Sequence, residues 1–112
     1  MDRIKKYRTI LKEFLTGEAA KKPSNAPKLE RQLIIDQAEN QFLLMTIGWH
    51  EEVYKHYAVY HFELKEGKIW LHQNNTDVPI GEILAEKGIP KSNMVIGFLG
   101  ELERGVEGYA TA

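Results

Sequence analysis

The first segment of the chain has apolar residues at intervals of three and four: Ile4, Tyr7, Ile10, Leu11, Phe14 and Leu15. This spacing is typical of an amphipathic helix with one apolar face. We expect the helix to run from about Asp2 to Leu15, with Asp2 as N-cap and Gly17 as its end. Two prolines and no apolar anchor then predict a linker over residues 21–27.

From Leu29 onward the apolar period becomes that of strands. Residues 29–35 alternate apart from Ile34, and residues 42–49 are apolar at both odd and even positions. The second pattern predicts a central strand covered on both faces. Gly48 within it indicates a bulge or a close approach of another backbone segment. Turns are expected at residues 36–40 and 50–52, followed by a strand over 53–65.

The segment Lys65-Glu66-Gly67-Lys68 predicts a two-residue hairpin turn. The turn sets a register in which Leu64 faces Ile69, Phe62 faces Leu71 and Tyr60 faces Gln73. The opposite side of this strand pair then carries Val59, His61, Glu63, Trp70, His72 and Asn74. In this register His61 lies directly across from His72.

The last third of the chain predicts one short helix and one more strand. Thr76-Asp77-Val78-Pro79 indicates a helix start with a Thr or Asp cap, and Gly88 indicates a left-handed C-terminal residue. Residues 94–98 predict a short buried strand, and nothing can be placed after Gly100. The whole pattern predicts an α+β domain, in which an antiparallel sheet of four to five strands carries an N-terminal helix and a short helix after the central hairpin. At 112 residues we expect a single domain over 1–112.

Composition narrows the class of protein further. Zero cysteines exclude disulfides and thiolate chemistry and fit a reducing compartment. The residues after Met1-Asp2-Arg3 include neither the apolar core of a signal peptide nor a membrane span, so a cytoplasmic protein is expected.

Charge is divided unevenly along the chain. Residues 1–31 hold nine Lys/Arg against four Asp/Glu, whereas the rest holds six against twelve. A basic N-terminal helix can attract DNA phosphates. One hypothesis is therefore direct nucleic-acid binding by Arg3, Lys5, Lys6, Arg8 and Lys12, with Lys21 and Lys22 of the linker. The alternative is an ordinary solvated helix face.

Catalytic and metal chemistry have little support in the sequence. His61 and His72, with Glu63 and Asn74, are spaced to form a metal site, but a polar sheet face on which the histidines pack beside Trp70 is the better explanation. The carboxylate pairs Glu51-Glu52 and Glu101/Glu103 are better explained as solvated turn charges than as an acid/base dyad. We therefore expect neither an enzyme nor a bound cofactor or metal.

Aromatic residues crowd the predicted sheet, namely Trp49, Tyr54, Tyr57, Tyr60, Phe62 and Trp70. Stacking on nucleic-acid bases is opposed by acidic neighbours such as Glu51, Glu52 and Glu63. Core packing or a protein interface is the better interpretation, because Tyr and Trp are common interface anchors.

A series of motifs resembles the XisI-like family, the fdxN-element excision controlling factors of cyanobacteria. In chain order they are Lys6-Tyr7-Arg8-Thr9-Ile10-Leu11, Ile47-Gly48-Trp49, His61-Phe62-Glu63-Leu64, Gly67-Lys68-Ile69-Trp70-Leu71-His72-Gln73-Asn74, Thr76-Asp77, Gly88-Ile89-Pro90-Lys91 and Met94-Val95-Ile96-Gly97-Phe98. Two segments depart from the family pattern. Residues 53–57 lack its arginine, and residues 104–109 differ from its Arg-x-Tyr-Thr-like ending.

The resemblance implies an accessory factor in the programmed excision of a DNA element. Such a factor acts beside a separate recombinase and a XisH-like companion, through protein contact rather than strand cleavage. The surface expected to bind the partner comprises Trp49, His61, Trp70, His72 and Asn74. A homodimer is a further hypothesis, and DNA contact is expected to be indirect.

Overall fold

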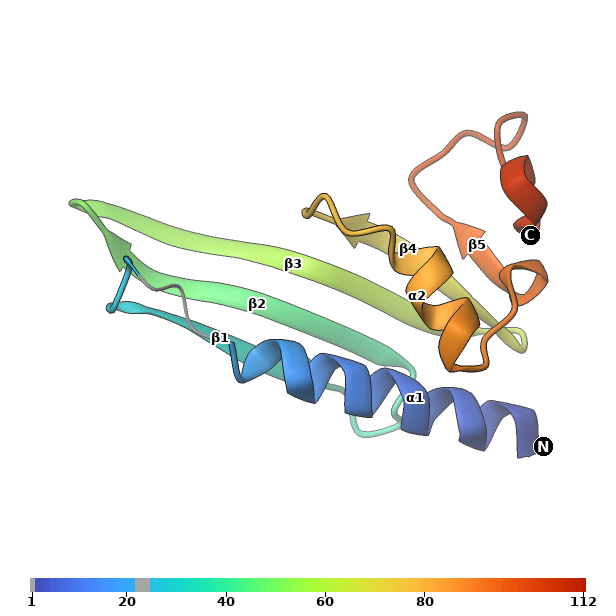
Figure 1. The fold of residues 1–112 in the computed structure, drawn as a ribbon, viewed down its shortest axis with the longest axis horizontal. Coiled ribbons are helices and arrows are strands. Elements are labelled where there is room, and N and C mark those ends of the chain that lie inside the picture. The colour runs from blue at the N-terminus through green and yellow to red at the C-terminus, as the bar shows by residue number, and fades with distance from the viewer. Residues whose placement is uncertain (1, 22–24) are drawn as a thin grey trace.

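The computed structural model describes residues 2–21 and 25–112. Part of the predicted linker, including Lys22, lies outside the described residues. The elements are α1 (Asp2–Ala19), β1 (Leu29–Ile35), β2 (Gln41–His50), β3 (Val53–Lys65), β4 (Lys68–Asn74), α2 (Ile80–Lys87) and β5 (Met94–Ile96), with short 3₁₀ turns at Lys91–Asn93 and Val106–Gly108. The strands form one five-stranded sheet in sequence order, which confirms the α+β prediction (Figure 1).

Helix α1 is longer than its sequence pattern predicted. It continues to Ala19, so the expected end at Gly17 is wrong. A Cβ on Gly17 would meet nothing within 4 Å, and Ala19 packs against the core. Tertiary packing of the last turn therefore overrides the weak helix propensity of one glycine.

Strands β1 to β4 form an antiparallel meander, but β5 lies parallel to β4. The expectation of a purely antiparallel sheet is wrong at this edge, because the crossover through α2 returns the chain to the starting end of β4. Strand β5 is also shorter than expected. It ends at Ile96, and the side chain of Phe98 is 57% exposed rather than buried.

The register between β3 and β4 follows the prediction only near the turn. Leu64 faces Ile69 and Phe62 faces Leu71, as expected. A β-bulge then shifts the pairing, so that Tyr60 faces Asn74 rather than Gln73. Each bulge adds one residue to one strand. In this bulge His72 is the extra residue, so His61 and His72 are not paired directly.

A second β-bulge, between β2 and β3, moves Val59 away from its predicted position. Leu44 faces Tyr60 and Met45 faces Ala58, which leaves Val59 as the extra residue. Its side chain is only 3% exposed and belongs to the core. The prediction that Val59 shares the face of His61 is therefore wrong.

The hydrophobic core lies on one face of the sheet, beneath α1 and α2 (Figure 1). Helix α1 contributes four buried side chains, and α2 contributes Ile80 and Leu84. Among the described residues, the side chains on the other face of β2 are not part of this core. Leu43, Met45 and Ile47 are only half-buried. The prediction that β2 is covered on both faces is thus wrong for the single chain, which covers only one.

Gly48 fulfils its predicted role as a point of close backbone approach. The loop of residues 25–28 crosses here, and a Cβ on Gly48 would overlap the carbonyl oxygen of Lys28. Gly48 also has a φ of 137°, which L side chains rarely adopt. The loop is thereby held against the far end of the β2–β3 hairpin.

Candidate interaction surface

The far end of the β2–β3 hairpin carries the distal aromatic cluster, which we define as Trp49, Val53, Tyr54 and Tyr57. This end of the hairpin projects past the C-terminal end of α1 (Figure 1). Trp49 is 54% exposed, Tyr54 51% and Tyr57 40%. The rings of Trp49 and Tyr54 meet edge-on with their centroids 5.3 Å apart. Trp49 and Tyr54 share the sheet face that points away from the helices, whereas Val53 and Tyr57 lie on the other face. Half-exposed aromatic side chains at one end of a hairpin are typical of protein interfaces.

The turn between the two strands has an unusual sequence for its geometry. Glu51 and Glu52 form a two-residue turn with φ of 50° and 70°, a conformation usually filled by Asn or Gly. Non-glycine residues held at positive φ carry a conformational cost, and they gather at functional sites. The turn adds two carboxylates beside the exposed rings.

A surface cavity of about 450 Å³ lies beside the same turn. It is lined by residues 25–28, which include the buried Ala26, and by residues 49–52. The approach of the 25–28 loop at Gly48 builds one wall, and residues 49–52 form the other. The distal end of the hairpin is therefore both aromatic and hollowed.

The two predicted histidines, His61 and His72, belong to a group of polar side chains in the middle of the sheet face that points away from the helices. The rings of His61 and His72 lie 4.9 Å apart despite the bulge. His72 Nε2 is 2.8 Å from Glu63 Oε1, and His61 Nε2 is 2.8 Å from Gln41 Oε1. Four neighbouring polar side chains thus bind one another in pairs.

Electrostatics at these four residues follow from burial and hydrogen bonding. Partial burial lowers the pKa of His61, and the nearby His72 lowers it further. The hydrogen bond from His72 lowers the pKa of Glu63. Within residues 2–21 and 25–112, no group of three or more His, Cys, Asp or Glu is arranged to hold a metal ion. The arrangement supports a network of polar contacts on the sheet.

Trp70, another residue of the predicted partner surface, is partly covered by its own chain. The ammonium of Lys65 lies 4.9 Å from the ring centroid and the guanidinium of Arg104 lies 5.2 Å from it. Arg104 in turn donates to the carbonyl oxygens of Leu99 and Gly97. Trp70 therefore holds the C-terminal segment against β4 through cation–π contacts.

Asn74 lies on the other face of the sheet, so its predicted position beside His61 and Trp70 is wrong. Its Oδ1 accepts hydrogen bonds from the backbone N–H and hydroxyl of Thr76, and its Nδ2 donates to the carbonyl of Val78. These bonds organise the loop before α2. Helix α2 has no side-chain cap, contrary to the predicted Thr or Asp cap, whereas Gly88 has the expected left-handed conformation.

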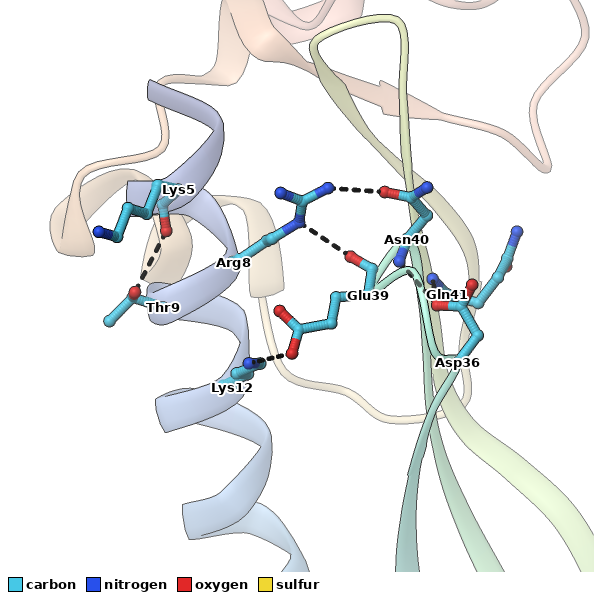
Figure 2. A network of polar contacts seen from close by, with 8 residues as sticks. All are labelled: Lys5, Arg8, Thr9, Lys12, Asp36, Glu39, Asn40 and Gln41. Atoms are coloured by element: carbon cyan, nitrogen blue, oxygen red, sulfur yellow. Dashed lines mark hydrogen bonds and ion pairs between the residues drawn. The ribbon is translucent and has the colours of Figure 1, made fainter. Parts of the chain in front are cut away.

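The nucleic-acid hypothesis depended on the basic residues of α1, and two of them, Arg8 and Lys12, make contacts within the protein. Figure 2 shows Arg8 donating to the carbonyl of Glu39 and to Asn40 Oδ1, and Lys12 paired with the Glu39 carboxylate at 2.6 Å. These bonds attach α1 to the β1–β2 turn, which Asp36 closes by accepting from the backbone N–H groups of Asn40 and Gln41.

The other members of the basic set lie along the N-terminal half of α1. Hypothetical Cβ atoms on Gly67 and Gly88 would lie about 3.0 Å from the side chains of Arg3 and Lys6 respectively, so both cations border turns of the fold. Lys5 and, beyond the helix, Lys21 are exposed. Lys21 pairs with Glu18 at 2.7 Å.

The structure thus leaves Trp49 as the most exposed member of the predicted partner surface and adds residues that the sequence did not single out. Val53 is half exposed at the same hairpin end but on the opposite sheet face. The glutamates of the turn, considered above only as an acid/base pair, border the cavity. The position of Val53 directly after a polar turn was the sequence feature that indicated its exposure. Its exposure depends on α1 ending before the hairpin does, which no local pattern encodes.

These features define a class of protein: a two-layer α+β domain with both helices on one sheet face and an aromatic hairpin end outside the core. None of its helices, within the part of the chain that the structure describes, is long and apolar enough to cross a membrane. The family described as XisI protein matches residues 1–111. The chain belongs to the XisI protein family.

Two solved structures share the fold over almost their whole length. A XisI-like protein from Anabaena variabilis ATCC 29413 is 35% identical, with a TM-score of 0.88 over 97% of this chain and 99% of that one. The fdxN element excision controlling factor XisI from the same organism is 24% identical, with a TM-score of 0.81 over 98% and 99%. The second likeness shows the fold alone. No curated protein matches the chain.

Proposed function

We propose that this protein is a non-enzymatic accessory protein, similar to the excision controlling factors of DNA elements, that acts by binding a protein partner. The observation that carries the proposal is the distal aromatic cluster on a chain of the XisI protein family. The cluster places large exposed rings beside a hollow, an arrangement that suits a partner's side chain better than it suits solvent.

The partner that the family suggests is a XisH-like companion. In this proposal the distal end of the hairpin binds the companion and DNA contact is made by other proteins. The polar side chains of Gln41, His61, Glu63 and His72 bind one another in pairs, which supports a structural rather than a catalytic role for them. The absence of cysteine from the sequence supports action in a reducing cytoplasm.

The experiment is a tagged capture from the native host, with and without nuclease, read by mass spectrometry. We expect a stoichiometric partner that survives nuclease and is lost from the double variant Trp49→Ala/Tyr54→Ala. Phe98→Ala is the matched control, because Phe98 is an equally exposed ring away from the hairpin. Its capture should equal that of the wild type.

Two outcomes contradict the proposal. Recovery that collapses with nuclease assigns the association to DNA and to the basic helix. Equal capture by the wild type and the double variant, with unchanged circular dichroism, removes the distal aromatic cluster as the binding surface.

A further inference from the structure

The sheet face opposite the helices carries a strip of uncovered apolar side chains in its middle. We call these residues the central strip: Ile34, Leu43, Met45, Ile47 and Ala58. Ile34 is 47% exposed, and the other four are half-buried. Among the described residues, none of the five belongs to the core or packs against it.

The central strip crosses three adjacent strands. Ile34 faces Leu43 across β1 and β2, and Met45 faces Ala58 across β2 and β3. Directly paired residues share a sheet face, so these side chains are neighbours. Along a strand with one solvated face, apolar and polar residues normally alternate, whereas β2 is apolar on both of its faces. Such a strand requires cover on both sides, and α1 and α2 supply it on one.

The chemistry of the central strip favours a second copy of this chain as the cover. A two-fold interface brings a surface against itself, so any charge in its middle would meet its own like charge. The central strip contains no ionisable side chain. The ionisable groups on the three strands beside it are Glu30 on β1 and His56, His61 and Glu63 on β3.

A two-fold axis along β2 would place β1 of one copy over β3 of the other. Glu30 would then lie on the side of the partner's histidines, and like charges would stay apart. Aligned sheets pack about 10 Å apart with interdigitated side chains, which places the apolar row of β2 at the centre of such an interface.

The available area is sufficient for a specific dimer. Strands β1, β2 and β3 are 7, 10 and 13 residues long. At about 4.8 Å between strands and about 3.3 Å per residue, the face of the three strands, its distal end included, projects to roughly 475 Å². Side-chain relief increases the accessible area, so two copies bury on the order of 1,200 Å², at the lower bound for stable interfaces.

We propose that two copies of this protein pack face to face through the central strip. Trp49 and Tyr54 lie at the distal end of the same sheet face, next to Ile47 and His56. The inference goes beyond the proposed function and does not depend on it. Met45 lies outside the distal aromatic cluster, so Met45→Glu tests the dimer, whereas Trp49→Ala/Tyr54→Ala tests the capture of a different protein.

The first test is the mass of the purified full chain by sedimentation equilibrium. We expect twice the 12.9 kDa of one chain. Met45→Glu places a charge at the centre of the two-fold interface and should weaken association at least about 100-fold, because like charges would then be buried together. Gln37→Glu, in the exposed β1–β2 turn, is the matched control and should remain dimeric.

A second test does not require the charged variant to fold. The chain has no cysteine, so Met45→Cys introduces a single thiol. We expect a disulfide or a short bismaleimide link to join two copies in high yield. Glu13→Cys, on the exposed face of α1, should give only background linkage.

Three results would overturn the proposal. A wild-type chain that sediments at the mass of one chain at millimolar concentration has no such dimer. A dimer that persists in folded Met45→Glu, or Met45→Cys linkage no greater than that of Glu13→Cys, uses another surface. A monomer whose central strip is protected only in a complex with a different protein assigns this face to that protein.

Discussion

Gly48 shows how one residue can fix the position of a whole loop. A side chain there would overlap the Lys28 carbonyl and would have to adopt a φ of 137°. We expect Gly48→Ala to lower the free energy of unfolding by about 2 kcal/mol or more, through strain and displacement of the loop. Urea denaturation followed by circular dichroism measures the change.

Gly17 provides the matched control for that substitution. It lies in α1, and a methyl group added to it would meet nothing within 4 Å, so Gly17→Ala should raise stability by about 0.5–1 kcal/mol. Equal effects of the two substitutions would contradict the assigned role of Gly48.

His61 gives a prediction for pH. Its pKa in the folded chain is lowered from 6.5 by burial. As pH falls through about 6.5 the unfolded chain therefore takes up a proton that folded His61 resists, so stability decreases toward acid. We expect His61→Gln to lose less stability than the wild type between about pH 7.5 and about pH 5, measured by urea denaturation at each pH.

Above about pH 5, the pH dependence of stability reports on His61 rather than on its neighbour Glu63. The lowered pKa of Glu63 contributes stability that is present above its ordinary value near 4.5 and is lost only as pH falls below that. A wild type and a His61→Gln variant with identical pH dependence down to about pH 5 would show that burial of His61 does not penalise its charged form.

At the scale of elements, α1 is tied to the β1–β2 turn by a few side chains far apart in sequence. Arg8 makes two bonds there, of 3.1 and 3.0 Å. We expect Arg8→Ala to lower the free energy of unfolding by about 1 kcal/mol, since the site is only partly buried. Lys5→Ala, at an exposed position on the same helix, should change it by less than about 0.5 kcal/mol. Chemical denaturation of both variants checks this.

The sequence pattern did not predict the two β-bulges. The hairpin turn at Glu66-Gly67 set the register correctly for Leu64 and Phe62, because a two-residue turn fixes the pairs beside it. Beyond the bulges, Val59 and Asn74 changed sides of the sheet. An inserted residue shifts all later pairs, and no local composition marked where it would occur.

At the scale of the whole molecule, the proposed dimer couples folding to concentration. If unfolding separates the copies, a tenfold increase in protein concentration should raise the thermal midpoint by about 3 °C. Differential scanning calorimetry at several concentrations measures this shift, and Met45→Glu should abolish it. A midpoint independent of concentration in the wild type would contradict coupled dissociation and unfolding.

The candidate surface was predicted only in part. Trp49 lies on the exposed end of the hairpin, where its aromatic neighbours were recognised as interface anchors. Trp70 was expected to belong to the same partner surface but packs under Arg104, which is separated from it by 34 positions in the chain. The side chains that cover a residue come from distant segments, and their arrival depends on the completed fold.

The sequence by itself determined the class of fold, the hairpin turns, the left-handed end of α2 at Gly88 and the family, because these depend on local periodicity, backbone freedom and ordered motifs. Only the tertiary structure decided which face of the sheet the helices cover, which side Val59 and Asn74 occupy, and that β5 runs parallel to β4. Those outcomes depend on packing between distant segments. The apolar pattern of β2 indicated two covered faces, and the fold shows that the chain itself covers one.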